Sequence, residues 1–113
     1  MSGFRLINGR YVIDKRQRSA LDYGIRLKPW LVEGDGISSS SQAMWTVSDG
    51  LTLVPGGTSI VQDPARGPIA YVKVAGGGAD GTQEWARCVW TTDQGRVEEL
   101  TMFFNMTTKA SAP

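Results

Sequence analysis

The sequence predicts an all-β fold, an immunoglobulin-like β-sandwich with an N-terminal extension, and three observations support this class. Roughly seven short apolar segments follow one another, with turn signals about every 8–12 residues. No segment has a convincing helical period. The 113 residues suffice to bury one core, and the single cysteine, Cys88, excludes an internal disulfide and favours folding in a reducing cytoplasm. A small barrel is the alternative architecture.

The first elements are expected within the first 28 residues. Residues 4–8 and 11–14 predict two short strands joined at Asn8-Gly9, a typical hairpin turn. Residues 15–19 are polar and basic, and we expect a linker there. Four apolar residues then alternate with other residues and predict a strand with one buried face, which Pro29 ends. These four are Leu21, Tyr23, Ile25 and Leu27.

The middle of the chain predicts shorter and less regular strands. Residues 37–47 indicate a strand with Ala43, Trp45 and Val47 on one face, although its serine-rich first half is compatible with a loop. Residues 51–54 form the next predicted strand. Pro55-Gly56-Gly57 breaks it, and residues 59–62 predict another short strand.

The last part of the chain predicts a strand over residues 69–75, a glycine loop over 76–81 and a hairpin over 85–104. Asp93-Gln94-Gly95 suits a three-residue hairpin loop with Gly95 in the left-handed conformation. This loop fixes a register in which Cys88 faces Leu100 and, on the other side, Trp85 faces Phe103. The predicted core is Leu21, Tyr23, Ile25, Trp45, Val72, Val74, Cys88, Leu100 and Phe104.

Three segments are expected: an N-terminal arm (residues 1–18), the sandwich domain (19–106) and a flexible C-terminal tail (107–113). In the hairpin register, the face away from the core is also apolar, and a monomer has little reason to expose it. We therefore expect either the N-terminal arm or another subunit to cover it. The interface candidates are Trp85, Arg87, Val89, Val97 and Phe103, with the basic residues Arg5, Arg10, Lys15, Arg16 and Arg18.

Charge is unevenly distributed along the chain. Residues 1–28 carry seven basic and two acidic side chains, a net charge of +5, whereas the remaining five basic and nine acidic side chains give −4. Such asymmetry can guide the acidic part of one copy onto the basic part of another. An ordinary solvated surface is the alternative.

The residue types present exclude several kinds of chemistry. Histidine is absent, which excludes Ser-His-Asp and Cys-His catalysis. Residues 76–81 match G-x-G-x-x-G, but a strand-like segment follows in place of the helix that dinucleotide binding needs. The acidic residues match no calcium loop, and the basic run 15–18 lacks interleaved aromatic residues. We expect no enzyme, no cofactor, no metal, no sequence-specific nucleic-acid binding, no signal peptide and no membrane span.

Several short motifs occur in an order and spacing that resemble the phage fiber-tail adaptor family over roughly residues 13–106. The motifs are Leu21-Asp22-Tyr23-Gly24-Ile25, Trp30-Leu31, Ile37 with the serines before Trp45-Thr46-Val47, Gly50-Leu51-Thr52, the glycine loop, Cys88 ahead of Thr91-Thr92, and Gly95-Arg96 followed by acidic residues. Residues 1–12 and the longer stretch 38–42 depart from the family pattern.

The resemblance implies a small β-sandwich protein of tailed bacteriophages, without catalysis or cofactor. It implies a place in the virion, in the tail or at the head–tail junction, after assembly in the bacterial host cytoplasm. The expected role is an adaptor that self-associates into a ring or collar and links other phage structural proteins, such as tail, connector or fibre components.

Two other classes of function compete with this expectation. An immunoglobulin-like module that binds carbohydrate or a cell surface would stack sugars on Trp30 and Trp85. A glycosidase would use two carboxylates across a cleft. No carboxylate pair stands out in the sequence, so the glycosidase ranks last.

Overall fold

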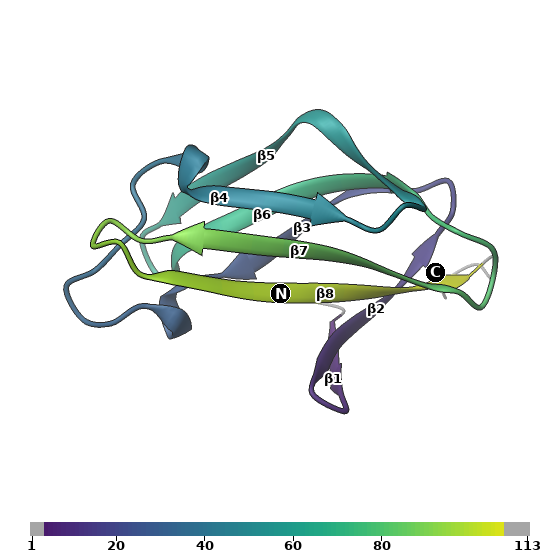
Figure 1. Ribbon diagram of the computed structural model, residues 1–113, viewed down its shortest axis with the longest axis horizontal. Helices are drawn as coiled ribbons and strands as arrows, with labels where there is room; N and C mark the ends of the chain where they lie inside the picture. The colour runs from purple at the N-terminus through teal and green to yellow at the C-terminus, as the bar shows by residue number, and fades with distance from the viewer. Residues whose placement is uncertain (1–3, 108–113) are drawn as a thin grey trace.

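The structure, a computed structural model, describes residues 4–107 as two β-sheets packed face to face. Figure 1 shows the two layers and the strand labels. One sheet has five strands in the order β1-β2-β8-β7-β4, and the other has three in the order β3-β6-β5. The strands are β1 (Arg5–Ile7), β2 (Arg10–Arg16), β3 (Ala20–Arg26), β4 (Ala43–Val47), β5 (Leu51–Asp63), β6 (Gly67–Gly76), β7 (Gln83–Thr91) and β8 (Val97–Thr107).

The prediction of an all-β sandwich is confirmed. The helical content of the described residues consists of two single 3-10 turns, Lys28–Trp30 and Ser40–Gln42. Residues 1–18 supply β1 and β2, and the rest of the two sheets comes from residues 19–107. Most of the predicted tail, residues 108–113, lies outside the described residues.

The N-terminal residues form the predicted hairpin. Asn8 and Gly9 both have positive φ, 50° and 79°, which is the conformation of a tight turn that suits the twist of a two-stranded ribbon. Beyond the turn, β2 pairs in parallel with β8, with Val12 opposite Phe103. The hairpin tip and β1 project away from the sandwich (Figure 1).

The predicted linker over residues 15–19 is wrong in its first half. Strand β2 continues through Arg16, and Lys15 is one of the most buried side chains in the protein. Its ammonium group finds backbone carbonyl partners inside the fold, which local composition cannot reveal.

The three-stranded sheet agrees with the predicted strands except at one place. β3 and β6 pair antiparallel over their whole length, and β6 also pairs with β5. The predicted break at residues 55–57 is a bulge within one long strand, because pairing with β6 stops after Leu53 and resumes at Thr58. β4 is shorter than predicted, since residues 37–42 form a loop and a 3-10 turn with Ile37 buried.

The predicted register of the last hairpin is confirmed in full. Trp85 lies opposite Phe103, Cys88 opposite Leu100 and Thr91 opposite Val97. Gly95 has φ 85°, as the three-residue loop requires. This register places alternate residues of the hairpin on the core side and on the outer side of the sheet, because successive side chains of a strand point to opposite sides.

The core lies between the two sheets and contains most of the predicted residues. Tyr23, Ile25, Val72, Val74, Cys88 and Phe104 are buried, and Trp45 and Leu100 pack against them from positions of partial exposure. Burial raises the pKa of the Cys88 thiol to about 12, so the thiol is neutral at physiological pH.

The core prediction is wrong for Leu21 and misses several buried residues. Leu21 is 56% exposed and lines a cavity whose other residues are mostly polar, among them Asp14, Lys15 and Ser19. The largest omission is Trp90, which is fully buried on the same face as Cys88 and Phe104. Other omissions are Val12, Ile37, Leu51, Ile69, Ala70 and Met106, whereas Leu27 is buried as the alternating pattern of its strand predicts.

Candidate protein-interaction face

The five-stranded sheet has an outer face that points away from the core. We define this outer face by Val12, Met44, Trp85, Arg87, Val89, Val97 and Phe103. The hairpin register places Trp85 beside Phe103, and the parallel pairing of β2 with β8 places Val12 on the other side of Phe103. Three apolar side chains therefore form a row across three neighbouring strands, opposite the face that carries Phe104 and Cys88.

Two arginines lie over the aromatic rings of this row. The Arg10 guanidinium carbon is 4.6 Å from the centre of the Phe103 ring, and that of Arg87 is 4.9 Å from the centre of the Trp85 ring. Hydrogen bonds hold both groups in place: Arg10 Nη1 donates to Gln83 Oε1 (3.1 Å), and Arg87 Nε donates to Thr101 Oγ1 (3.3 Å). The N-terminal arm thus contributes two residues to the second apolar face: Val12 belongs to the row, and Arg10 covers the Phe103 ring.

The part of the outer face toward β4 carries no such cover. Met44 is 70% exposed and Val97 is 62% exposed. Val89 lies opposite Met44 across the β4–β7 pair and is half-buried. Two apolar side chains of the outer face, Met44 and Val97, therefore remain open to solvent, and the Arg87–Thr101 pair separates them from the aromatic row.

The basic candidates of the N-terminal segment have different environments. Arg5 forms an ion pair with Asp14 (3.3 Å) in which both side chains are more than half exposed, so the pair adds little stability. Arg16 and Arg18 are exposed. Lys15 is only 2% exposed.

The Lys15 ammonium donates to three backbone carbonyls, those of Arg16 (3.0 Å), Ser19 (2.8 Å) and Gly76 (2.6 Å). Burial lowers the pKa of this amine. Lys15 thus joins the end of β2 to the end of β6, and its charge is used inside the fold rather than on the surface.

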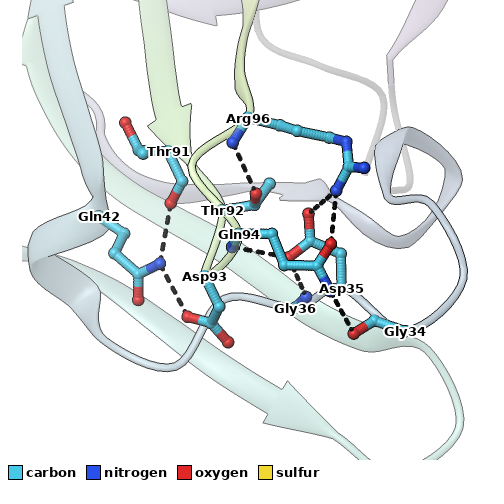
Figure 2. Close-up of polar contacts among 9 residues, drawn as sticks. All are labelled: Gly34, Asp35, Gly36, Gln42, Thr91, Thr92, Asp93, Gln94 and Arg96. Carbon is cyan, nitrogen blue, oxygen red and sulfur yellow. Dashed lines mark hydrogen bonds and ion pairs between the residues drawn. The ribbon is translucent and has the colours of Figure 1, made fainter.

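A polar network fastens the loop before β4 to the β7–β8 turn (Figure 2). Gln42 Nε2 donates to the Thr91 carbonyl (2.8 Å) and to Asp93 Oδ1 (3.0 Å). Arg96 Nη1 donates to Asp35 Oδ2 (3.1 Å), and the Asp35 side chain is fully screened from solvent. The stretch 38–42 is therefore tied to the hairpin beside Val97.

The pKa values of the two carboxyl groups of this network, Asp35 and Asp93, lie below their usual range. Burial raises the pKa of Asp35, but hydrogen bonds from Thr92, Gly36, Arg96 and Gln94 outweigh burial and hold it below its usual value. The ionised Asp35 carboxylate therefore stabilises the folded state at pH values above the unfolded-state pKa of Asp, about 3.9, and this stabilisation is lost as the pH falls through the folded-state pKa of Asp35.

We expect Asp35→Asn to lower the thermal midpoint at pH 7, and the difference from wild type to shrink as the pH falls through the folded-state pKa, because the wild-type carboxylate then becomes protonated itself. Differential scanning calorimetry over a series of pH values from 7 downward measures this. Asp49→Asn, in the exposed turn after β4, is the control and should have little effect across the series. A deficit of the Asp35 variant that does not change with pH would contradict the assignment.

The structure can also be compared with the other sequence features that were considered for binding. The glycine loop over residues 76–81 leads into β7, a strand, so it lacks the helix that would hold a phosphate. Within residues 4–107, no group of three or more His, Cys, Asp or Glu side chains is placed to hold a metal ion. No helix in the same range is long and apolar enough to cross a membrane.

The network and the arginine covers were missed from sequence alone. Asp35 and Arg96 are 61 positions apart, and Arg10 and Gln83 are 73 positions apart. The sequence Glu33-Gly34-Asp35-Gly36 predicts a loop at this place but not its partners in the β7–β8 turn.

Comparison with known protein families gives one match. The family described as "Podophage GP4 fiber-tail adaptor protein gp77" matches residues 15–105 of the 113. The match includes both sheets' central strands and nearly all of the outer face, whereas β1 and all of β2 except its last two residues precede it. No curated protein and no solved structure matches the chain. The chain belongs to the podophage GP4 fiber-tail adaptor family.

Proposed function

We propose that this protein is a non-catalytic adaptor of a podophage tail, present in several copies, that joins tail components or fibres through its outer face. Family membership supports the adaptor role and a location in the virion tail. The observation that carries the proposed contact surface is the exposure of the apolar side chains Met44 and Val97 on the same face of the sheet as Phe103 and Trp85.

The outer face has the composition of a protein-binding surface. Its centre is aromatic and apolar, and Arg87 and Arg10 add directed hydrogen-bond donors at the same place. Aromatic residues, Met and Arg are enriched at protein interfaces, where aromatic anchors and Arg supply much of the binding energy. A partner that covers Met44 and Val97 would remove from water the largest exposed apolar side chains of this face.

The experiment replaces Met44 and Val97 with Glu in the full chain and supplies the variant to the parent phage lacking its own copy. We expect a folded protein, because both side chains are mostly exposed, and loss of the variant from purified particles. Quantitative mass spectrometry of the particles and infectivity measure the effect, and circular dichroism checks the fold.

The control is Val61→Glu, which introduces one Glu, against two in the test variant, at a 46% exposed valine on β5, in the opposite sheet. This variant should enter particles like the wild type. Normal incorporation of the Met44/Val97 variant would place the contact elsewhere. Loss of both variants would show that the assay reports added charge rather than the outer face.

The carbohydrate-binding alternative has less geometric support. The Arg87 guanidinium lies over the Trp85 ring, so this ring face is not free to stack on a sugar. Trp30 packs edge-on against the buried Trp90, with 6.2 Å between ring centres. Trp85 and Trp90 lie on opposite faces of β7, so Trp30 and Trp85 do not form a shared platform.

A further inference from the structure

The free edge of β3 borders a cavity that the outer face does not explain. Among the strands that the structure describes in residues 4–107, β3 lies at a sheet edge and pairs only with β6. A cavity of about 360 Å³ runs along it, lined by Phe4, Tyr23, Ile69 and Tyr71, with Asp22, Arg26 and Arg66 at its polar margin. An unpaired edge strand presents backbone donors and acceptors that another strand can complete.

The charges of β3 are complementary to themselves. Asp22 and Arg26 project to the same side of the strand, with Gly24 midway between them. If two copies of β3 pair antiparallel about a two-fold axis at Gly24, Asp22 of each copy lies opposite Arg26 of the other. Directly opposed unlike charges stabilise antiparallel strand pairs, so the charges select this register.

Gly24, at the centre of this pairing, has no side chain. The Tyr71 ring of the neighbouring strand β6 lies against it, because a Cβ atom at position 24 would lie 2.8 Å from Tyr71 Cε1. In the β3–β6 pair, Lys73 lies opposite Asp22, which leaves the other side of Asp22 facing the free edge.

We propose that β3 is a self-association edge, through which two copies of this chain form a continuous six-stranded sheet in the order β5-β6-β3-β3-β6-β5. The contact uses the three-stranded sheet, whereas the outer face belongs to the other sheet. The inference therefore does not rest on the proposed tail contact, and either can fail without the other.

Charge reversal tests the pairing. Asp22→Arg places like charges opposite Arg26 of the other copy, and Arg26→Asp does the same with Asp22, so each should weaken association by at least about tenfold. The double variant Asp22→Arg/Arg26→Asp restores unlike pairs and should associate as the wild type does. Sedimentation velocity of the full chain from about 1 to about 100 µM measures the association.

Two controls separate pairing from folding. Circular dichroism establishes that each variant is folded. Asp49→Arg makes the same charge change in an exposed turn outside β3 and should leave association unchanged. A wild-type protein that stays monomeric over this range, single variants that associate normally, or a double variant that is not restored would each overturn the proposal.

Discussion

Replacing Trp90 with Ala is expected to lower the free energy of unfolding by about 3–5 kcal/mol, the usual cost of deleting a buried large aromatic side chain. Trp90 is fully buried and is the largest such side chain among the described residues. Total stability of a domain is only about 5–15 kcal/mol, so much of it would be lost. The thermal midpoint, followed by circular dichroism, should fall by at least about 12 °C.

Trp90→Phe is the matched control. The Trp90 indole Nε1 is buried and has no hydrogen-bond partner in the structure, so Phe keeps much of the ring volume and removes an unsatisfied donor. Its cost should be less than half that of Ala. Trp45→Ala should also cost less, because Trp45 is only partly buried. Equal losses for the Trp90 and Trp45 alanine variants would contradict the central position of Trp90.

Replacing Lys15 with Met is expected to cost about 2–4 kcal/mol. The change leaves the carbonyls of Arg16, Ser19 and Gly76 without their shared donor in a buried place. Hydrogen bonds to charged groups contribute about 1.5–3 kcal/mol, and an unsatisfied buried acceptor costs about 1–3 kcal/mol. Chemical unfolding in urea, extrapolated to water, measures the difference.

Arg16→Met controls for the loss of one positive charge from the same segment. Arg16 is exposed, and a surface change of this kind stays within about 0.5 kcal/mol of wild type. Wild-type stability of the Lys15 variant would mean that desolvation of the ammonium costs as much as its three hydrogen bonds return.

Local pattern and turn chemistry predicted those parts of the fold that depend on neighbouring residues. The register of the β7–β8 hairpin followed from a three-residue loop, because the loop fixes which residues face each other and the strand period fixes their sides. The same reasoning found the Asn8-Gly9 turn and the buried side of β3.

Long-range pairing could not be predicted in the same way. β2 pairs with β8 across about ninety intervening residues, and no local pattern of residues 10–16 identifies that partner. Two predictions of burial were wrong for this reason. Leu21, near the start of β3, was predicted to be buried and is exposed. Lys15, near the end of β2, was predicted to lie in a polar linker and is buried against three backbone carbonyls. The sequence also identified Trp85 and Phe103 as neighbours, but it did not reveal that arginines cover their rings.

The parallel pairing of β2 with β8 imposes an order on folding during synthesis. The three-stranded sheet is complete in sequence once residue 76 has left the ribosome, since β3, β5 and β6 all precede that point. Strand β2 is made earlier, but its pairing partner does not exist until residues 97–107 emerge, and β4 likewise waits for β7. Non-local pairing of this kind slows folding, because a long chain segment must be closed before the contacts form. The outer face is therefore assembled last, so a nascent or truncated chain cannot present it and compete with finished copies for a place in the particle.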